Sequence, residues 1–227
     1  MEKRRIIIGS RGSQLALIQA HAVMAKLKEL SFQTEIVTIE TLGDKESNQP
    51  LNQLGSVGLF IKELEVSLLS KHIDIAVHSM KDVPSFIPEG LVLAATTERF
   101  DARDVLVSKT ASSICNLPEN ARIATGSIRR RSQLKGIRPD LQIEDLRGNV
   151  PTRLKKFDNS HWEAIILAGA GLIRLGLKHR ISTFIPITEM IPAVGQGALV
   201  LETRKDDFEL RKLLEKLNHK NTEVATE

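Results

Sequence analysis

The sequence predicts an α/β protein built from two lobes. Short apolar runs of strand length alternate with longer segments of helical periodicity from the first residues onward. The polar stretch ERFDARD, at 98–104, interrupts this alternation, which then resumes. A last strand and helix follow the loop PAVGQG, at 192–197. With 227 residues, 41% of them hydrophobic, the chain is long enough for two cores.

The first series of elements ends near Thr97. Strands are expected at 4–10, 34–42, 73–80 and 90–97. Helices are expected at 13–30 and 58–72, where apolar residues repeat at helical spacing. Ser13 is placed to cap the first of these helices, because a serine oxygen accepts from free backbone N–H groups. These elements together make one α/β lobe.

The second series alternates in the same way and ends near Pro192. Its segments, in chain order, are 105–109, 122–127, a helix that starts at the arginines of 129–131, and then 141–147, 150–157, 162–168 and 170–180. The final strand at 198–204 and helix at 207–220 come after a complete second set of strands. We therefore place this last pair back on the first lobe.

This placement defines the expected domains. Lobe 1 takes residues 1–98 and 198–227, and lobe 2 takes residues 104–192. The crossings at 99–103 and 193–197 act as hinges. The expected architecture is the two-lobed, type II fold of periplasmic binding proteins, with a ligand cleft between the lobes.

Composition excludes several classes of protein. No apolar run approaches membrane-spanning length, and the three isoleucines after the charged N-terminus are too few for a secretory signal. The single cysteine, Cys115, excludes an internal disulfide framework and a cysteine-cluster metal site. We therefore expect a cytoplasmic protein with no membrane partner and no bound metal.

Positive charge is concentrated in one segment. Residues 122–156 contain ten Lys or Arg and three Asp or Glu, whereas the remaining residues are mildly acidic. Such a segment attracts anionic ligands. Nucleic acid is disfavoured, because only 4% of residues are aromatic, tyrosine is absent, and no zinc-finger or RNA-binding motif occurs.

The segment TGSIRRR sits where an anion would bind. A strand, a turn and a helix start present free backbone N–H groups and the positive end of the helix dipole. Thr125, Gly126 and Ser127 add hydroxyls and close backbone approach, and Arg129 and Arg130 add forked donors for carboxylates or phosphates. The alternative is a solvated first turn. Cations are unfavourable at a helix N-terminus, which favours the anion site.

Other strand ends supply matching groups. The residues are Arg11, Ser13, Arg147 and Arg153. Loops at the carboxyl ends of parallel strands converge on one crevice, so these side chains are expected to meet there. So many arginines suit a ligand with several carboxylates better than a single phosphate. Arg131 and Arg138 are expected to face solvent instead.

Two further residues lie in HSMKDVP, at 78–84. Asp82 is either a turn residue or, in a basic cleft, an ionised group that stabilises a cation or accepts a proton. The sequence leaves both interpretations open. His78 is expected to be packed or hydrogen-bonded, because no second ligand has metal-binding spacing.

Seven motifs in order resemble one family. They are SRGSQLALIQA, GLFIKELE, DIAVHSMKDVP, GSIRRRSQL, LRGNVPTRL, AGLIRLGL and PAVGQGAL. The chain resembles porphobilinogen deaminases, also called hydroxymethylbilane synthases, from Arg5 to its last residue. The resemblance implies the two-lobed fold plus a third, C-terminal α+β domain.

The resemblance also implies a transferase of tetrapyrrole and haem biosynthesis. Such enzymes condense four porphobilinogens with loss of ammonia, through electrophilic azafulvenes, and water then releases hydroxymethylbilane. Asp82 matches the aspartate that stabilises the cationic intermediates. The positions that match polar or carboxylate-binding residues of the family are Arg11, Ser13, Lys81, Ser127, Arg129, Arg130, Arg147, Arg153, Arg174 and Gln196.

The sequence departs from the family at several positions. Val57 and Gln53 stand where lysines are usual, and Gly126 replaces a serine. The 227 residues stop at LNHKNTEVATE, before the third domain, whose cysteine carries the dipyrromethane cofactor. Cys115 matches nothing in that attachment motif. We therefore expect no third domain, no attachment cysteine, and very slow or absent turnover by the chain alone.

Two functions stay open at this point. The first is a porphobilinogen deaminase that acts as a monomer on a small molecule, its cofactor domain truncated or supplied by a separate cysteine-bearing polypeptide. The second is a non-catalytic or partner-dependent binding protein for pyrrole polycarboxylates or another polyanion. Release of ammonia from porphobilinogen distinguishes the two.

Overall fold

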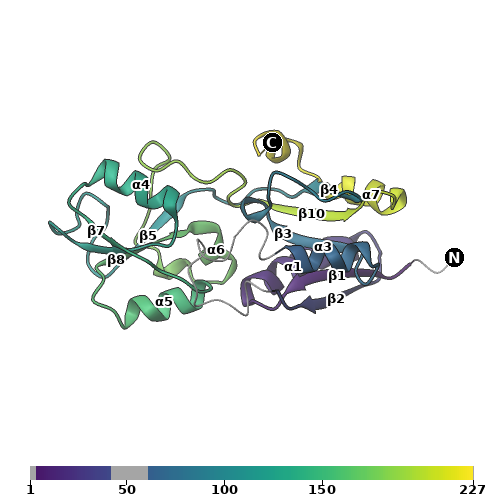
Figure 1. Cartoon of the computed structure of the whole chain (residues 1–227), viewed down its shortest axis with the longest axis horizontal. Coiled ribbons are helices and arrows are strands. Elements are labelled where there is room, and N and C mark those ends of the chain that lie inside the picture. The colour runs from purple at the N-terminus through teal and green to yellow at the C-terminus, as the bar shows by residue number, and fades with distance from the viewer. Residues whose placement is uncertain (1–3, 42–60, 227) are drawn as a thin grey trace. The chain divides into compact units, whose positions relative to one another are not determined.

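A computed structural model describes residues 4–41 and 61–226 of the chain (Figure 1). It contains helices and two five-stranded sheets, which confirms the predicted α/β class. The chain divides into two compact units. Unit 1 comprises Met1–Arg99 with Ala198–Glu227, and unit 2 comprises Phe100–Gly197. Each unit contains one of the two sheets.

The sheet of unit 1 has the strand order β2-β1-β3-β10-β4. Its strands are β1 (Ile6–Arg11), β2 (Thr34–Ile39), β3 (Ile75–Ser79), β4 (Leu91–Thr96) and β10 (Leu199–Arg204). β1 pairs in parallel with β2 and β3, whereas β10 runs antiparallel between β3 and β4. The strand that comes last in the sequence thus lies inside the first sheet.

Helices cover both faces of this sheet. α1 (Gln14–Glu29) and α7 (Phe208–Leu214) share a buried cluster with the strands, and this cluster includes Ile8, Leu27 and Leu214. On the other face, α3 (Lys62–Leu69) packs through Leu64 and Leu68, which are fully buried. The β1, β3 and α1 labels mark this part of Figure 1. These layers fix the strand ends from which the polar loops of unit 1 extend.

The sheet of unit 2 has the order β7-β6-β8-β5-β9. Its strands are β5 (Asp104–Ser108), β6 (Arg122–Ala124), β7 (Gln142–Glu144), β8 (Ala164–Ala168) and β9 (Thr183–Phe184). Its α-helices are α4 (Ile128–Ile137), α5 (Val150–Asp158) and α6 (Gly169–Arg174). One buried cluster packs on Leu134 of α4, and a second packs on Leu154 of α5 and Leu172 of α6.

The predicted helix at 207–220 is not continuous. α7 ends at Leu214, a 3-10 turn follows at Glu215–Leu217, and α8 occupies Lys220–Val224. The break has a visible cause. The Asn218 side chain accepts from Thr96 N at 2.8 Å, and His219 N donates to Thr96 O at 2.7 Å. Both contacts tie the chain to the end of β4 and prevent a longer helix.

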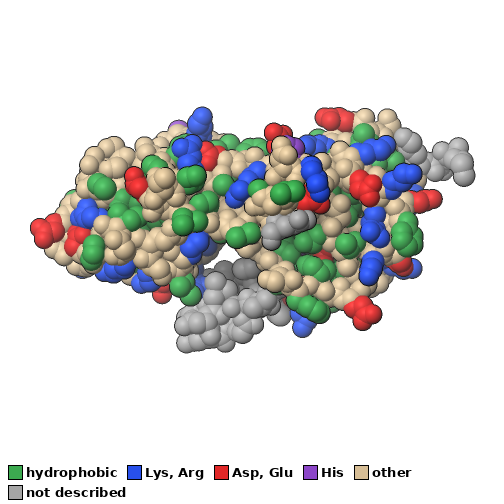
Figure 2. Space-filling view, turned by 90° about the horizontal axis from the view of Figure 1, so that it is seen from above, with side chains coloured by type: hydrophobic (Ala, Val, Ile, Leu, Met, Phe, Trp, Pro, Cys, Tyr) green, Lys and Arg blue, Asp and Glu red, His purple; other side chains and the backbone are tan. Residues whose placement is uncertain are grey.

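Charged side chains are spread over the molecular surface. On the face shown in Figure 2, basic and acidic side chains are interspersed, and hydrophobic side chains lie in small groups between them. None of the helices in the described part of the chain is long and apolar enough to cross a membrane.

Candidate functional site

A small hollow in unit 1 contains several of the predicted site residues. Its volume is about 80 Å³. Its polar lining residues are Arg11, Ser13, Gln19, His78, Ser79 and Asp82. They come together because β1 and β3 are parallel neighbours and end at the same edge of the sheet. Within this unit the loops after β1 and β3 therefore lie together, whereas Arg147 and Arg153 belong to unit 2.

The local structure orients these side chains. Ser13 caps α1, and its Oγ accepts from Ala16 N at 3.3 Å. Gln19 Nε2 donates to Ser79 Oγ at 3.0 Å, which ties α1 to the end of β3. Lys81 and Asp82 then follow in the 3-10 turn Met80–Asp82, and both are exposed.

The Asp82 carboxylate makes no hydrogen bond to the backbone of the turn in which it lies. The turn is closed by a backbone bond from Val83 N to Met80 O at 3.1 Å. Within residues 4–41 and 61–226, the Asp82 side chain accepts no hydrogen bond. An aspartate that served turn chemistry alone would bond to nearby backbone N–H groups. The Asp82 carboxylate is therefore exposed and makes no turn-closing hydrogen bond among the described residues.

His78 is buried and hydrogen-bonded, as the sequence suggested. Its Nε2 lies 2.9 Å from Glu202 Oε2, and the two side chains are 3% and 1% exposed. Sequence reasoning had not identified Glu202 as its partner. The described part of the chain shows no group of three or more His, Cys, Asp or Glu residues able to hold a metal ion.

In unit 2, the arginines of the TGSIRRR segment are organised by one buried carboxylate. Asp104, the first residue of β5, is fully buried. Its oxygens accept from Arg129 Nη2 at 2.7 Å, from Arg130 Nε at 3.0 Å and from Gln196 Nε2 at 3.0 Å. The sequence analysis missed Asp104. A signal existed, since an acidic residue directly before an apolar strand needs a cationic partner when the strand is buried.

The two neighbouring arginines therefore differ. Arg130 is 5% exposed, and it also donates to Ile166 O at 3.1 Å. Burial lowers the pKa of its guanidinium, although Asp104 acts in the opposite direction. Arg129 is more open, with a side chain 26% exposed, and its Nη1 donates to Ile191 O. Arg129 has an Nε–H and further Nη–H donors that could bind a ligand. Arg130 instead stabilises the fold through its bonds to Asp104 and Ile166 O.

The start of α4 has the expected capping geometry. Ser127 is the N-cap and accepts from Arg130 N at 3.4 Å, and Thr125 Oγ1 accepts from Ser127 N at 3.3 Å. Gly126 lies against the next loop, so that a Cβ at this position would be 2.6 Å from Leu146 O. The absence of a side chain lets the loop that carries Arg147 approach the start of α4.

Three further arginines of unit 2 were predicted to bind anions. Arg153 Nε donates to Gly148 O at 2.6 Å, which orders the loop that contains Arg147. Arg147 is partly exposed and has no side-chain partner among the described residues. Arg174 is half-buried, donates to Gly197 O at 2.9 Å and stacks 4.5 Å from the Phe100 ring centroid. Within the described part of the chain, Arg174 has no carboxylate partner.

Arg174 is therefore a desolvated cation without a counter-ion. Desolvation lowers the pKa of its guanidinium to about 10. A buried charge of this kind destabilises a fold unless an anion pairs with it. Arg174 and Arg147 are two partly buried side chains of unit 2 with no carboxylate partner among the described residues, which suits carboxylates of a ligand.

The expectation that Arg131 and Arg138 simply face solvent was wrong for Arg138. Its side chain is 20% exposed and binds Asp140 at 2.7 Å. It also donates to the carbonyls of Ile114, Cys115, Leu117 and Pro118. The guanidinium thus ties down the loop at 114–118. Arg131 is more open, at 39% exposed, and pairs with Asp145 at 2.7 Å.

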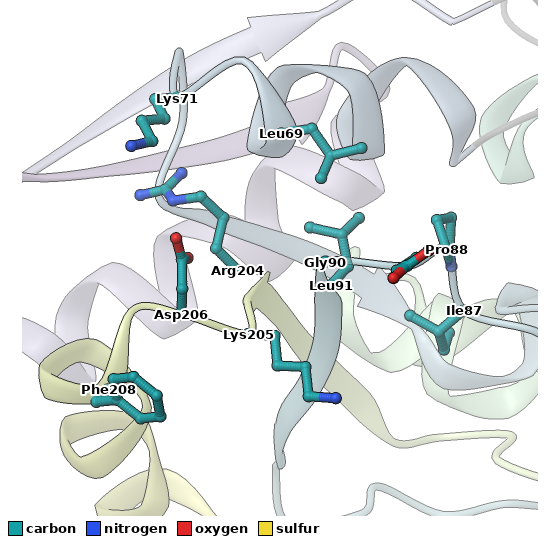
Figure 3. Close-up of a pocket in the computed structure, with 11 residues that line it drawn as sticks. Leu69, Lys71, Ile87, Pro88, Gly90, Leu91, Arg204, Lys205, Asp206 and Phe208 are labelled. Atoms are coloured by element: carbon teal, nitrogen blue, oxygen red, sulfur yellow. The ribbon is translucent and has the colours of Figure 1, made fainter.

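A second, larger groove of unit 1 lies elsewhere. It has a volume of about 620 Å³, and its lining includes Leu69, Ile87, Leu91 and Phe208 but none of the predicted site residues (Figure 3). The guanidinium of Arg204 reaches this groove, but it already donates to Leu68 O, Ile73 O and Asp74. Lys71 and Lys205 also line this groove and are exposed, but neither belongs to the predicted site. Val57 and Gln53 lie outside the described residues.

Comparison with known proteins decides the family. The profile described as "Porphobilinogen deaminase, dipyromethane cofactor binding domain" matches residues 6–212. A porphobilinogen deaminase of Chlorobium luteolum is 49% identical over 225 residues, which cover 98% of this chain and 72% of the relative. That of Chlorobaculum tepidum is 50% identical over 227 residues, with the same coverage. The chain belongs to the porphobilinogen deaminase family.

Solved structures show the fold. A periplasmic substrate-binding protein of an ABC transporter from Coxiella burnetii matches with a TM-score of 0.54 and 16% identity, over 97% of this chain and 94% of that one. A methionine-binding protein matches with a TM-score of 0.54 and 13% identity, over 97% and 93%. The fold class is therefore the predicted type II, periplasmic-binding-protein-like one.

Proposed function

We propose that this chain binds porphobilinogen and the growing pyrrole chain, and that it carries out the deaminase reaction of tetrapyrrole biosynthesis. The observation that carries this proposal is the uncompensated charge of Arg174, half-buried and with a pKa lowered to about 10. Porphobilinogen carries an acetate and a propionate side chain. Either carboxylate would supply the anion that Arg174 lacks in the described structure.

Unit 2 supplies the other carboxylate contacts. Arg147 offers a guanidinium without a described partner, and Arg129 offers the donors that Asp104 and Ile191 leave free. Arg153, Ser127 and Gln196 hold the surrounding loops through their own hydrogen bonds. Arg130 is proposed to bind indirectly, by keeping Asp104 and hence Arg129 in place. A polycarboxylate chain that gains two acids with each added ring suits such a set of cations.

Unit 1 supplies the chemistry in this proposal. Loss of ammonia from porphobilinogen leaves an electron-poor, cationic pyrrole, which a carboxylate stabilises. The Asp82 carboxylate accepts no hydrogen bond within the described residues, so it is available to a pyrrole N–H. Arg11 and Ser13 line the same hollow and are proposed to hold a side-chain carboxylate, with Lys81 beside Asp82 in the turn.

The residues present fit the carboxylates of a dipyrromethane, but not its attachment. Arg129, Arg147 and Arg174 would hold its acidic side chains. When bound, this group supplies the pyrrole carbon to which the first porphobilinogen is joined. The thiol of Cys115 is exposed on the loop at 114–118, whose carbonyls surround Arg138. The attachment cysteine is therefore proposed to belong to a separate or additional domain.

A second candidate is supported by the same arginines. A non-catalytic protein that binds pyrrole polycarboxylates would use Arg147 and Arg174 equally well, but it would not require an unengaged Asp82. We favour the enzyme for this reason. We further propose a monomer located in the cytoplasm, an environment in which a lone cysteine stays reduced.

The test combines binding and ammonia release. Calorimetry measures porphobilinogen affinity, and an ammonia assay is run with the chain alone and with added preformed bilane. In the preparation that is active, we expect Asp82→Asn to keep the affinity and the thermal midpoint but to lose most ammonia release, at least about tenfold. Asp206→Asn, an exposed aspartate in the large groove, is the matched control and should change neither.

Each result has a distinct meaning. Binding without ammonia release under either condition would support the non-catalytic candidate. Absence of binding would contradict the proposal as a whole. Normal turnover by Asp82→Asn would reduce Asp82 to a turn residue.

A further inference from the structure

The buried pair of His78 and Glu202 has no assigned role in the reaction. His78 lies on β3 and Glu202 on β10, and the antiparallel register places both on the same face of the sheet. His78 lines the hollow that contains Asp82, and its Nε2 lies 2.9 Å from Glu202 Oε2. A histidine paired with a carboxylate is therefore among the residues that line this hollow.

The surroundings of Glu202 are costly for a residue of purely structural function. Its side chain is 1% exposed, and Oε1 has no hydrogen-bond partner among the described residues. Burial raises the pKa of the nearby Glu65 on α3, and the charge of Glu202 adds to this effect. A β-bulge between Leu201 and Glu202 interrupts the pairing of β10 with β4. Bulges re-aim side chains and occur next to active sites.

The hydrogen bond links the tautomer of His78 to the state of Glu202. With an ionised Glu202, which only accepts, Nε2 carries the proton that the pair shares. In the neutral imidazole, Nδ1 then has the free lone pair. Nδ1 makes no hydrogen bond to a described residue. A carboxylate in this position orients an imidazole and stabilises the imidazolium that forms when it takes a proton.

We propose that His78, oriented by Glu202, exchanges protons with the free α-carbon of a pyrrole bound at Asp82. This inference rests on the proposed function. In the condensation, a new C–C bond at the α-carbon leaves a pyrrolium that still carries its α-hydrogen. The C–H bond breaks, its electron pair returns to the ring, and the proton forms an N–H bond at His78 Nδ1. Asp82 stabilises the cation, and the imidazolium then releases the proton to solvent.

The same step is measurable without any condensation. In D₂O, a deuterated His78 imidazolium would deliver a deuteron to the α-carbon of bound porphobilinogen and then remove the original proton. The α-proton signal of porphobilinogen would decay in the NMR spectrum, with no need for the cofactor or for turnover. With the 227-residue chain present, we expect the exchange to be at least about tenfold faster than in buffer.

Variants separate this role from folding. His78→Asn and Glu202→Gln should each remove most of the acceleration, while porphobilinogen affinity, measured by calorimetry, changes by less than about twofold. His72→Asn is the matched control, because His72 is an exposed histidine of the same unit, bonded to Ser70 Oγ. The control should exchange as fast as the parent. Circular dichroism establishes that each variant is folded.

Two outcomes would overturn the inference. One is a parent chain that binds porphobilinogen but exchanges no faster than buffer. The other is a His78→Asn variant that binds and exchanges like the parent. Both leave the proposed binding function intact. If the parent does not bind porphobilinogen, the proposed function itself fails, and the calorimetric measurement shows this separately.

Discussion

At the scale of single residues, Asp104 determines how the arginines of unit 2 can act. It is fully buried and is shared by Arg129, Arg130 and Gln196. One negative charge between two guanidiniums leaves a net positive charge at the start of α4. Because Arg130 is buried, the more exposed guanidinium is that of Arg129, whose proposed role is to bind a ligand.

Loss of the Asp104 charge should therefore destabilise unit 2. In Asp104→Asn, Arg130 would remain buried without a counter-ion, and removal of one partner from a buried pair costs about 3–5 kcal/mol. Asp145→Asn is the control, because Asp145 is 75% exposed and its pair with Arg131 should contribute less than about 1 kcal/mol. Urea unfolding followed by circular dichroism measures both. Equal losses of stability in Asp104→Asn and Asp145→Asn would show that the buried charge of Asp104 stabilises unit 2 no more than an exposed ion pair does.

Arg174 should behave in the opposite way. If the proposed function holds, its desolvated guanidinium stabilises a bound carboxylate more than it stabilises the fold. We expect Arg174→Met to leave the thermal midpoint unchanged or raised, while porphobilinogen affinity falls at least tenfold, about 1.4 kcal/mol. Arg180→Met, which breaks only a pair with Asp158, should leave affinity unchanged. A large fall in the thermal midpoint with normal affinity would make Arg174 a structural residue.

At the scale of elements, the close approach at Gly126 positions the loop that carries Arg147. A Cβ at this position would lie 2.6 Å from Leu146 O, which is backbone and cannot rotate away. We expect Gly126→Ala to displace this loop, to destabilise unit 2 by about 1–3 kcal/mol, and to weaken ligand binding. The measurements are urea unfolding and calorimetry.

Gly136 provides the matched control for Gly126. It lies inside α4, and a Cβ there would meet no atom within 4 Å. Alanine is the better helix former by about 1 kcal/mol, so Gly136→Ala should stabilise unit 2 without changing affinity. If both alanine variants stabilise the protein, the loop at 146–148 has room to adjust.

Asp74 connects several elements of unit 1. It accepts from Ile7 N at 2.9 Å and from Arg204 Nη2 at 2.7 Å, and it also pairs with Arg4. Burial acts to raise its pKa, but these hydrogen bonds and charges outweigh burial, so the pKa is lowered from its ordinary 3.8. The carboxylate therefore stabilises unit 1 above pH 3.8, and this stabilisation is lost as the pH falls through the lowered pKa.

The lowered pKa of Asp74 predicts how its contribution to the stability of unit 1 changes with pH. At pH 7, Asp74→Asn should lower the free energy of unfolding, measured with urea, by about 3 kcal/mol or more. The substitution removes the charged partner of the buried Arg204. The difference from the parent should shrink as the pH falls toward 2, because the parent then protonates Asp74. A difference that stays constant with pH would mean that Asp74 contributes through packing and not through its charge.

Sequence patterns predicted the helices and strands better than the contacts between distant side chains. Alternating periodicity identified most strands and helices, and the family motifs singled out Arg174 and Asp82 as candidate site residues, a prediction that the proposed experiments test. Neither signal revealed the partners Asp104 and Glu202, because side chains far apart in sequence meet only through the strand order. Likewise, Arg138 looked solvated, since its carbonyl partners at 114–118 form no sequence pattern with it. The break at Asn218 depends on docking to Thr96, which helical periodicity does not encode.

At the scale of the whole molecule, the chain combines two α/β units that each carry part of the proposed site. Unit 1 carries Arg11, Asp82 and the pair of His78 and Glu202, and unit 2 carries Arg129, Arg147 and Arg174. Neither unit offers a thiol beside these groups, because the one cysteine of the 227 residues is Cys115 on the loop at 114–118. In the proposed function, the residues that bind the substrate are therefore distinct from the cysteine that attaches the pyrrole chain.

We therefore expect the purified 227-residue chain to carry no covalent dipyrromethane. The carbonyls of Ile114 and Cys115 bind Arg138, so this loop is fixed around that guanidinium. Without a tethered pyrrole, each substrate is held only by its carboxylates, and turnover should be very slow or absent. A preformed bilane or an added cysteine-bearing domain should restore it.

Intact-mass spectrometry and a steady-state assay of the chain alone measure the two expectations. An adduct of two pyrrole units mapped to Cys115 would contradict the first, and rapid hydroxymethylbilane formation without a supplement would contradict the second.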